Sequence, residues 1–231
     1  MIDSSIAGHT PEPLDPDLKD SRGLTALNCS AIKGDQQMVE LLRGRGNANL
    51  EESSPKGCTP LLYASRGGYQ EMVRYLLQRG ASSLKQDNAG GTVLHHAIEK
   101  GHLDVLRVLI EEGIDVQAAI EVADNAGRTP LYEAIDNNAS ASLVSFLIRK
   151  RQAGGFGAKV NVTDYNGHSP LYCAVRETNF ELVRVLLDEG EAQVDLYGTE
   201  TKFQETHEAE SYDSPEEKYF MEAFYNSMTP L

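Results

Sequence analysis

The residues best suited to catalysis or metal binding in this chain are a pair of adjacent histidines and three cysteines. His95 and His96 carry imidazoles, the groups used as metal ligands and general bases, and Cys29, Cys58 and Cys173 carry thiols. A zinc site would need further carboxylate and cysteine ligands at ligand spacing, and the sequence around the histidines holds no such cluster. A cysteine nucleophile would need a nearby base and an activating environment, and no local signature of either accompanies the cysteines. The sequence therefore predicts neither a metal site nor a catalytic residue.

A glycine-rich stretch at Gly154, Gly155 and Gly157 is the other candidate for chemistry, because closely spaced glycines can wrap a phosphate group. It lacks the Lys and the Ser or Thr that follow the glycines in a phosphate-binding loop. With no catalytic group and no cofactor motif, the chain is expected to be a binding protein rather than an enzyme.

A short sequence motif that occurs five times indicates the structural elements that carry these residues. The motif, or phrase, is Thr or Ser, then Pro or a small residue, then Leu. The copies begin at Thr25, Thr59, Thr92, Thr129 and Ser169, so successive copies lie 34, 33, 37 and 40 residues apart. A small residue lies three positions after each leucine, and an aliphatic run follows that often ends in glycine, at Gly46, Gly80, Gly113 and Gly190. One copy is too small to bury its own apolar face, so neighbouring copies must supply the rest of the core.

The phrase and its period of about 33 residues resemble the ankyrin repeat. The third copy matches best, with Thr92, Leu94, His95, Ala97 and Gly101 in the family's positions. The resemblance implies a mostly α-helical fold, an ankyrin-repeat solenoid of stacked helix-turn-helix units with short β-turn or hairpin connections. It covers five repeats, at about residues 20–53, 54–86, 87–123, 124–163 and 164–200. It also implies a structural role for His95, because the family uses this ring to hydrogen-bond neighbouring turns.

Helix boundaries follow from capping chemistry. A Thr or Ser hydroxyl can cap free backbone amides and Pro has no amide to lose, so first helices are predicted to begin near Pro60, Pro130 and Pro170. The glycines that end the second helices are expected to take a left-handed conformation. The extra residues of the third repeat fall at 117–122, where either a longer helix end or a loop would absorb them. The segment 149–159 has three glycines and four basic residues and is predicted to be an exposed loop.

Both ends of the chain depart from the repeat. Residues 1–19 hold three prolines and few apolar side chains, which predicts a flexible N-terminal arm. Residues 201–231 combine an acidic segment with a short aromatic helix whose capping box begins at Ser214. This helix is expected to cap the fifth repeat, and the alternative is a docking helix for a partner. Ser214 is also a candidate phosphorylation site, since Pro215 and two glutamates follow it. The closing residues 229–231 repeat the opening phrase of a sixth repeat, so the chain is expected to be part of a longer array.

Composition limits the partners and the compartment. Lys plus Arg number 21 and Asp plus Glu 35, a formal net charge of −14, which argues against nucleic-acid binding and against attraction to anionic membranes. No secretory signal and no membrane-spanning apolar run is evident, so no membrane insertion is expected. The odd number of cysteines, all in repeat positions, favours a reducing compartment, either cytoplasmic or nuclear.

The predicted binding face comes from sorting charges by repeat position. The positions that usually face a partner in ankyrin-like units hold three acids, Glu99, Asp136 and Glu177, and seven basic residues: Arg22, Lys33, Lys56, Arg66, Lys100, Arg128 and Arg176. This distribution predicts a basic strip that would attract an acidic or phosphorylated protein segment, with Tyr165 and His168 as aromatic contacts. The alternative is a scatter of solvated charges with no specific role. Reversing Arg66, Lys100 and Arg128 to Glu is expected to weaken association and leave the fold intact.

The function predicted from the sequence is a protein-binding scaffold or adaptor that uses the concave ankyrin surface. The alternative is a regulatory or targeting part of a larger enzyme or channel.

Overall fold

The structure, a computed structural model, describes residues 15–150 and 154–193. Several predictions concern residues outside this range: the first part of the N-terminal arm, the end of the fifth repeat, the acidic segment, Ser214, the aromatic helix and the candidate sixth repeat. The last part of the predicted arm is within it and is hydrogen-bonded rather than free. Lys19 Nζ donates to Ser53 O at 3.1 Å, and Asp17 Oδ1 accepts from Asn49 N at 2.9 Å.

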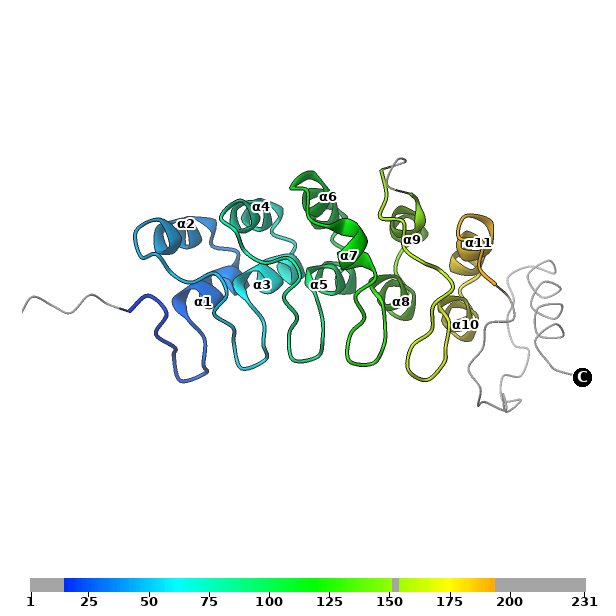
Figure 1. Ribbon diagram of the computed structural model, residues 1–231, viewed down its shortest axis with the longest axis horizontal. Coiled ribbons are helices and arrows are strands. Elements are labelled where there is room, and N and C mark those ends of the chain that lie inside the picture. The colour runs from blue at the N-terminus through cyan, green and yellow to red at the C-terminus, as the bar shows by residue number, and fades with distance from the viewer. Residues whose placement is uncertain (1–14, 151–153, 194–231) are drawn as a thin grey trace, which may run out of the picture.

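Ten helices form two parallel rows, one helix of each repeat in each row (Figure 1). The first helices of the five repeats are α1 (Ala26–Lys33), α3 (Pro60–Gly67), α5 (Val93–Glu99), α8 (Pro130–Asp136) and α10 (Pro170–Arg176). The second helices are α2 (Gln36–Gly44), α4 (Gln70–Gln78), α6 (Leu103–Glu111), α9 (Ala141–Ile148) and α11 (Phe180–Asp188). Each first helix packs against the next one, and the described residues contain no strand. The predicted helical solenoid with short turn connections is confirmed.

The first helices begin where the capping chemistry predicted. Pro60, Pro130 and Pro170 are the first residues of α3, α8 and α10, and the hydroxyl of the preceding Thr or Ser accepts a backbone amide in each case. Thr25 caps α1 in the same way. The repeat leucines then fall on the buried face of their helices, and each is at most 2% exposed: Leu27, Leu61, Leu94, Leu131 and Leu171.

The glycine prediction holds at two second-helix ends and is wrong at two others. Gly80 and Gly113 have φ values of +89° and +69°. After α2 and α11 the residue that follows the glycine, Asn47 or Glu191, takes the positive φ instead. The reason is one extra residue in the connection. Ala81 N bonds to the carbonyl five residues earlier, whereas the equivalent amides after α2 and α11 bond to the carbonyl six residues earlier.

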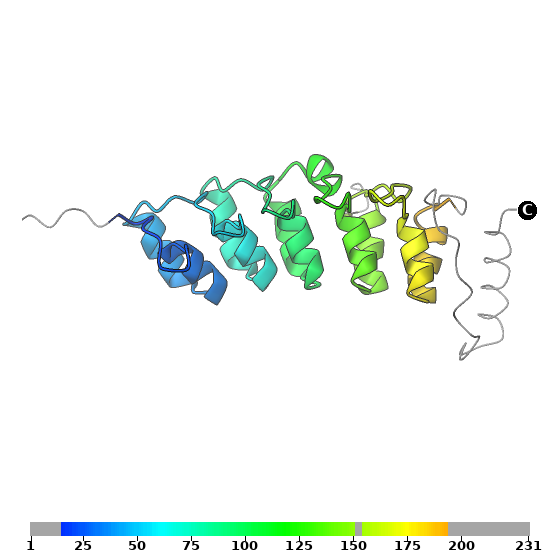
Figure 2. The same ribbon diagram turned by 90° about the horizontal axis from the view of Figure 1, so that it is seen from below.

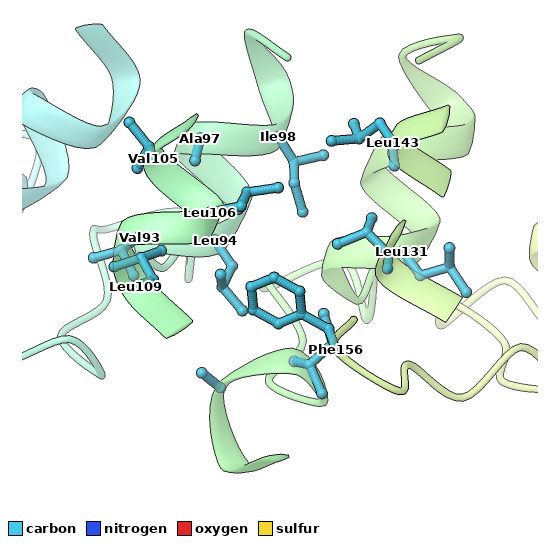
Figure 3. Close-up of a cluster of buried hydrophobic side chains, with 14 of the residues drawn as sticks. Val93, Leu94, Ala97, Ile98, Val105, Leu106, Leu109, Leu131, Leu143 and Phe156 are labelled. Carbon is cyan, nitrogen blue, oxygen red and sulfur yellow. The ribbon is translucent and has the colours of Figure 1, made fainter. Parts of the chain in front are cut away.

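The two lengthened repeats hold the largest departures from regularity. The extra residues of the third repeat form a short helix, α7 (Val116–Ile120), and Ile120 is buried. The segment 149–159 was predicted to be an exposed loop, and this prediction is wrong at Phe156. That side chain is only 1% exposed and packs edge-on against Phe146 with ring centroids 5.6 Å apart. Phe156 lies in the core beside Leu94 and Leu131 (Figure 3). Its backbone amide also bonds to Phe146 O at 3.2 Å, so this segment closes the carboxyl end of α9.

None of the helices in the described residues has the length and apolar composition that a bilayer-crossing segment requires.

Candidate binding face and a buried polar cluster

The five turns before the first helices share one hydrogen-bond pattern. In the fourth repeat, Asp124 N donates to Arg128 O at 2.9 Å and Gly127 N donates to Asp124 O at 3.0 Å. Gly127 has a φ of +81°, which glycine adopts without strain. The same two bonds close the turns that begin at Asp20, Ser54, Asp87 and Asp164. The backbone of all five turns is therefore held in one conformation.

Further backbone hydrogen bonds join successive turns from the second repeat to the fifth. Asn88 N donates to Lys56 O at 3.0 Å, Asn125 N to Ala89 O at 2.9 Å, and Tyr165 N to Ala126 O at 3.0 Å. The turns consequently form a continuous band at one end of the helices (Figure 2) and extend beyond the row of first helices (Figure 1).

Two side chains at each turn tip are exposed, and they differ from repeat to repeat: Ser21 and Arg22, Pro55 and Lys56, Asn88 and Ala89, Asn125 and Ala126, and Tyr165 and Asn166. A fixed backbone that presents unlike side chains is suited to specific recognition.

The aspartate at the start of a turn anchors it. Asp124 Oδ1 accepts from Ala126 N and Arg128 N, both at 2.9 Å, and the carboxylates of Asp20, Asp87 and Asp164 accept the equivalent amides. Burial alone would raise the pKa of Asp124, but hydrogen bonds from the side chain and backbone of Arg128 outweigh burial and lower its pKa. The pKa values of Asp20 and Asp164 are lowered as well, so these two carboxylates and that of Asp124 favour the folded chain while they are ionised.

Five of the seven predicted basic residues are already paired with acids of this chain, and four of these five lie in the second to fifth repeats. Arg66 Nη2 and Lys100 Nζ both contact Glu99 Oε1, at 3.0 and 2.9 Å. Arg128 contacts Asp124, Glu133 and Asp136 at 2.7, 3.3 and 3.4 Å, and Arg176 contacts Asp136 at 3.0 Å. Asp124 and Glu133 were not counted in the sequence analysis, because they lie outside the repeat positions that usually face a partner.

The other three predicted basic residues lie in the first two repeats. Arg22 pairs with Asp20 at 2.9 Å and, together with Lys56, lines a shallow depression between the first two turns. Lys33 and Lys56 are exposed and have no ion pair within the part of the chain that the structure describes. The free positive charge of the predicted strip is therefore concentrated at the N-terminal repeats.

The two predicted aromatic contacts differ in their surroundings. Tyr165 is 78% exposed at its turn tip, and its ring covers the preceding turn, because a Cβ added at Gly127 would lie 2.6 Å from the ring. His168 stacks on Tyr172 with centroids 4.5 Å apart and an interplanar angle of 5°. Tyr165 is thus available to a partner, while His168 is packed against its own helix.

His95 has the structural role that the resemblance implied. Its Nδ1 lies 2.9 Å from Thr92 Oγ1, and its Nε2 lies 3.1 Å from Arg128 O in the turn of the next repeat. Burial lowers the pKa of His95, which favours the neutral ring. This ring therefore links the start of α5 to the following turn.

His96 lies in a different environment, which reasoning along the chain missed. Its Nε2 is 3.0 Å from Asp87 Oδ2, and that same oxygen is 3.8 Å from Cys58 Sγ, contributed by the preceding repeat. His96 Nδ1 is 3.8 Å from Glu99 Oε2. Ligand spacing within one repeat could not reveal this cluster, because the fold, rather than the local sequence, brings Cys58 to the histidine.

Cys58 and Cys173 are buried and are not arranged as activated nucleophiles. Burial, reinforced by Asp87, raises the pKa of Cys58 to about 11. Burial likewise raises the pKa of Cys173, whose Sγ donates to Tyr132 Oη at 3.0 Å. Both thiols are consequently protonated at neutral pH.

Stacked two-helix units joined by rigid, exposed turns define a helical-repeat solenoid. A family model for ankyrin repeats, which contains three copies, matches residues 6–87, 46–120, 82–164 and 117–197. The chain therefore belongs to the ankyrin repeat family, whose repeats form protein-interaction modules.

Known relatives share the repeats within much longer proteins. The chain is 31% identical over 136 residues to NF-kappa-B inhibitor cactus of Drosophila melanogaster, covering 58% of this chain and 25% of that protein. It is 30% identical over 178 residues to putative palmitoyltransferase ZDHHC13 of Danio rerio, covering 77% of this chain and 26% of that protein. It is 36% identical over 101 residues to the B-cell lymphoma 3 protein homolog of Mus musculus, covering 44% and 20%. The chain thus spans about a quarter or less of each relative.

Proposed function

We propose that this chain is a protein-interaction scaffold or adaptor that binds its partner along the turn tips and the adjoining first helices. The observation that carries the proposal is the exposure of all ten tip side chains on a backbone whose turns are hydrogen-bonded within and between repeats. A surface of this kind can recognise a partner without a conformational change of its own. The relationship to an NF-kappa-B inhibitor supports a role in binding another protein.

The partner segment that fits this face best is acidic or phosphorylated. Lys33 and Lys56 offer positive charges that no acid within the described ranges neutralises, and Tyr165 offers an exposed aromatic ring at the far end of the face. Aromatic side chains are enriched at interface centres, and unpaired charges steer association. The cytoplasm or nucleus is the proposed location, supported by three cysteines that are all free.

An affinity capture with matched variants tests this proposal. Lys56→Glu and Tyr165→Ala change exposed turn tips, whereas Arg107→Glu makes the same charge reversal on α6, in the opposite row (Figure 1). A specific partner identified by mass spectrometry should be lost with both turn variants and kept with Arg107→Glu, and its affinity should fall as salt rises. A partner that binds both turn variants as well as the parent would show that recognition lies elsewhere.

The second candidate function is a regulatory or targeting part of a larger enzyme or channel. The alignment to a putative palmitoyltransferase favours it, because 77% of this chain matches 26% of that protein. A gene that continues past residue 231 into a domain of another type would support this candidate, and a stop codon there would support the free adaptor.

A further inference from the structure

A buried cluster of three different metal-ligating side chains lies between the second and third repeats. Cys58 Sγ, a carboxylate oxygen of Asp87 and a ring nitrogen of His96 all lie within 4.8 Å of one another. Cys58 is 4% and His96 8% exposed. We propose that this cluster binds one zinc-type divalent ion, with Cys58 Sγ, Asp87 Oδ2 and His96 Nε2 as its protein ligands.

The carboxylate is already oriented for this role. Asp87 Oδ1 accepts from Ala89 N at 2.9 Å and Gly91 N at 2.8 Å, so the turn backbone fixes the carboxylate. Its second oxygen, Oδ2, faces His96 at 3.0 Å and Cys58 at 3.8 Å. Ligand atoms around a tetrahedral zinc ion are roughly 3.3 to 3.8 Å apart. The widest separation in the cluster, at most 4.8 Å, would therefore contract by about 1 Å, and the 3.0 Å separation of His96 Nε2 and Asp87 Oδ2 would lengthen slightly.

A second carboxylate lies near the other ring nitrogen of the histidine, beyond hydrogen-bond distance. His96 Nδ1 faces Glu99 Oε2 at 3.8 Å, one turn further along α5. Metal-binding histidines commonly direct the nitrogen that does not bind metal toward a carboxylate, which sets the tautomer and the ring angle. That arrangement leaves Nε2 for the ion.

Charge balance and ligand type favour zinc over magnesium or calcium. When the sulfur–metal bond forms, the Cys58 thiol releases its proton to solvent. The resulting thiolate and the Asp87 carboxylate together neutralise the two charges of the ion, which suits a buried site. Sulfur and imidazole ligands select zinc-type ions, whereas magnesium and calcium prefer an all-oxygen set. Three protein ligands leave the fourth position to water.

The corresponding contact in the second repeat shows what a purely structural pair looks like. There Tyr63 Oη donates to Ser54 Oγ at 2.9 Å, and neither residue is a zinc ligand. The third repeat has His96 and Asp87 in these two positions, with a cysteine beside them. If the cluster served only to hold the turn, metal would have no effect on it.

A cobalt titration of the full, reduced chain tests the proposal, because Co²⁺ reports thiolate coordination in its absorption spectrum. One ion per chain should bind, with a sulfur-to-cobalt band in the near ultraviolet and visible bands of a four-coordinate ion, and Zn²⁺ should displace it. Zn²⁺ alone should raise the melting temperature. Failure of the wild-type chain to bind saturably with this band overturns the proposal, whatever the variants do.

Variants then assign the ligands. Cys58→Ser and His96→Asn should each abolish the sulfur band or weaken binding at least about tenfold, while Cys29→Ser and His102→Asn should leave it unchanged. Glu99→Gln should weaken binding by about 10- to 100-fold and keep the band, as expected of a residue that only positions His96. Circular dichroism without metal checks that each variant is folded. A band that survives Cys58→Ser, or that is lost in Cys29→Ser, places the ion elsewhere and overturns the assignment.

Discussion

At the scale of single residues, the paired arginines have a different role from the unpaired lysines. Arg128 is one-third exposed and contacts three carboxylates, on Asp124, Glu133 and Asp136. Reversing its charge would place a fourth carboxylate among them. The sequence predicts that Arg66, Lys100 and Arg128 can be reversed together with the fold intact; because all three contact acids within the molecule, we expect the joint reversal to cost stability as well.

The stability of two single variants checks this distinction. Arg128→Glu should lower the free energy of unfolding by about 3 kcal/mol, since it removes one partner of a partly buried pair and adds repulsion. Lys33→Glu, at an exposed site with no ion pair in the described residues, should change it by less than about 0.5 kcal/mol. Urea unfolding followed by circular dichroism measures both. Equal losses in the two variants would show that the ion-pair network contributes no local stability.

The family resemblance predicted the role of His95, and nothing in the sequence predicted the surroundings of His96. His95 lies in a family position, and both its contacts follow from the repeat, because the next turn always lies beside that ring. The surroundings of His96 depend on Cys58. A cysteine directly before the capping Thr or Ser occurs only in the second of the five repeats. Such a contact requires the packing of one repeat on the next and cannot be read from either repeat alone.

At the scale of elements, the starts of the helices and the lengths of the regular repeats were predictable from the sequence. The conformation of the inserted residues was not. Thr or Ser followed by Pro fixed three helix starts, because capping is local chemistry. Residues 149–159 were predicted as an exposed loop from their glycines and charges, although Phe156 was the one signal for burial. Whether an insertion folds inward depends on a space between neighbouring repeats, which the sequence does not display.

Phe156 is buried at the junction between the third and fourth repeats, where it lies with Leu94 and Leu131 in the core (Figure 3). Phe156→Ala should lower the free energy of unfolding by about 3 to 5 kcal/mol, because it opens a cavity in the core. Phe156→Leu should cost distinctly less, since it keeps most of the volume. Thermal melts of both variants measure the difference. A loss of under about 1 kcal/mol in the alanine variant would mean that this segment does not hold the two repeats together.

At the scale of the whole molecule, the repeat period was sufficient to predict the architecture, because one unit cannot bury its own apolar face and must stack on another. The charge distribution was less accessible. The chain carries a formal charge of −14, yet several of its carboxylates are held in turns and ion pairs whose partners are known only from the fold. These two facts make opposite predictions for stability in acid.

Protonation of a chain at −14 relieves repulsion, which would stabilise the fold as pH falls. Protonation of the turn aspartates acts the other way. Burial alone would raise the pKa of Asp124 and Asp164, but hydrogen bonds from Arg128 and His168, among others, lower both values in the folded chain. The Asp20 pKa is also lowered, chiefly by its hydrogen bond from Leu24 N. A carboxyl whose pKa is lower when folded contributes stability above its unfolded value of about 3.9, and this contribution is lost as pH falls through the folded value.

Below the unfolded pKa of about 3.9, the stability lost by protonating the turn aspartates should exceed the stability gained by relieving charge repulsion. The reason is that these aspartates recur along the solenoid and each one anchors a turn. The melting temperature should therefore change little between pH 7 and about 5 and fall steeply below about 4. The double variant Asp124→Asn, Asp164→Asn should be less stable at pH 7 and show a shallower acid decline, while Asp104→Asn, at an exposed site on α6, should follow the parent. Melting curves at a series of pH values measure both effects. A parent chain that becomes more stable below pH 4 would show that overall repulsion, rather than turn anchoring, controls its response to acid.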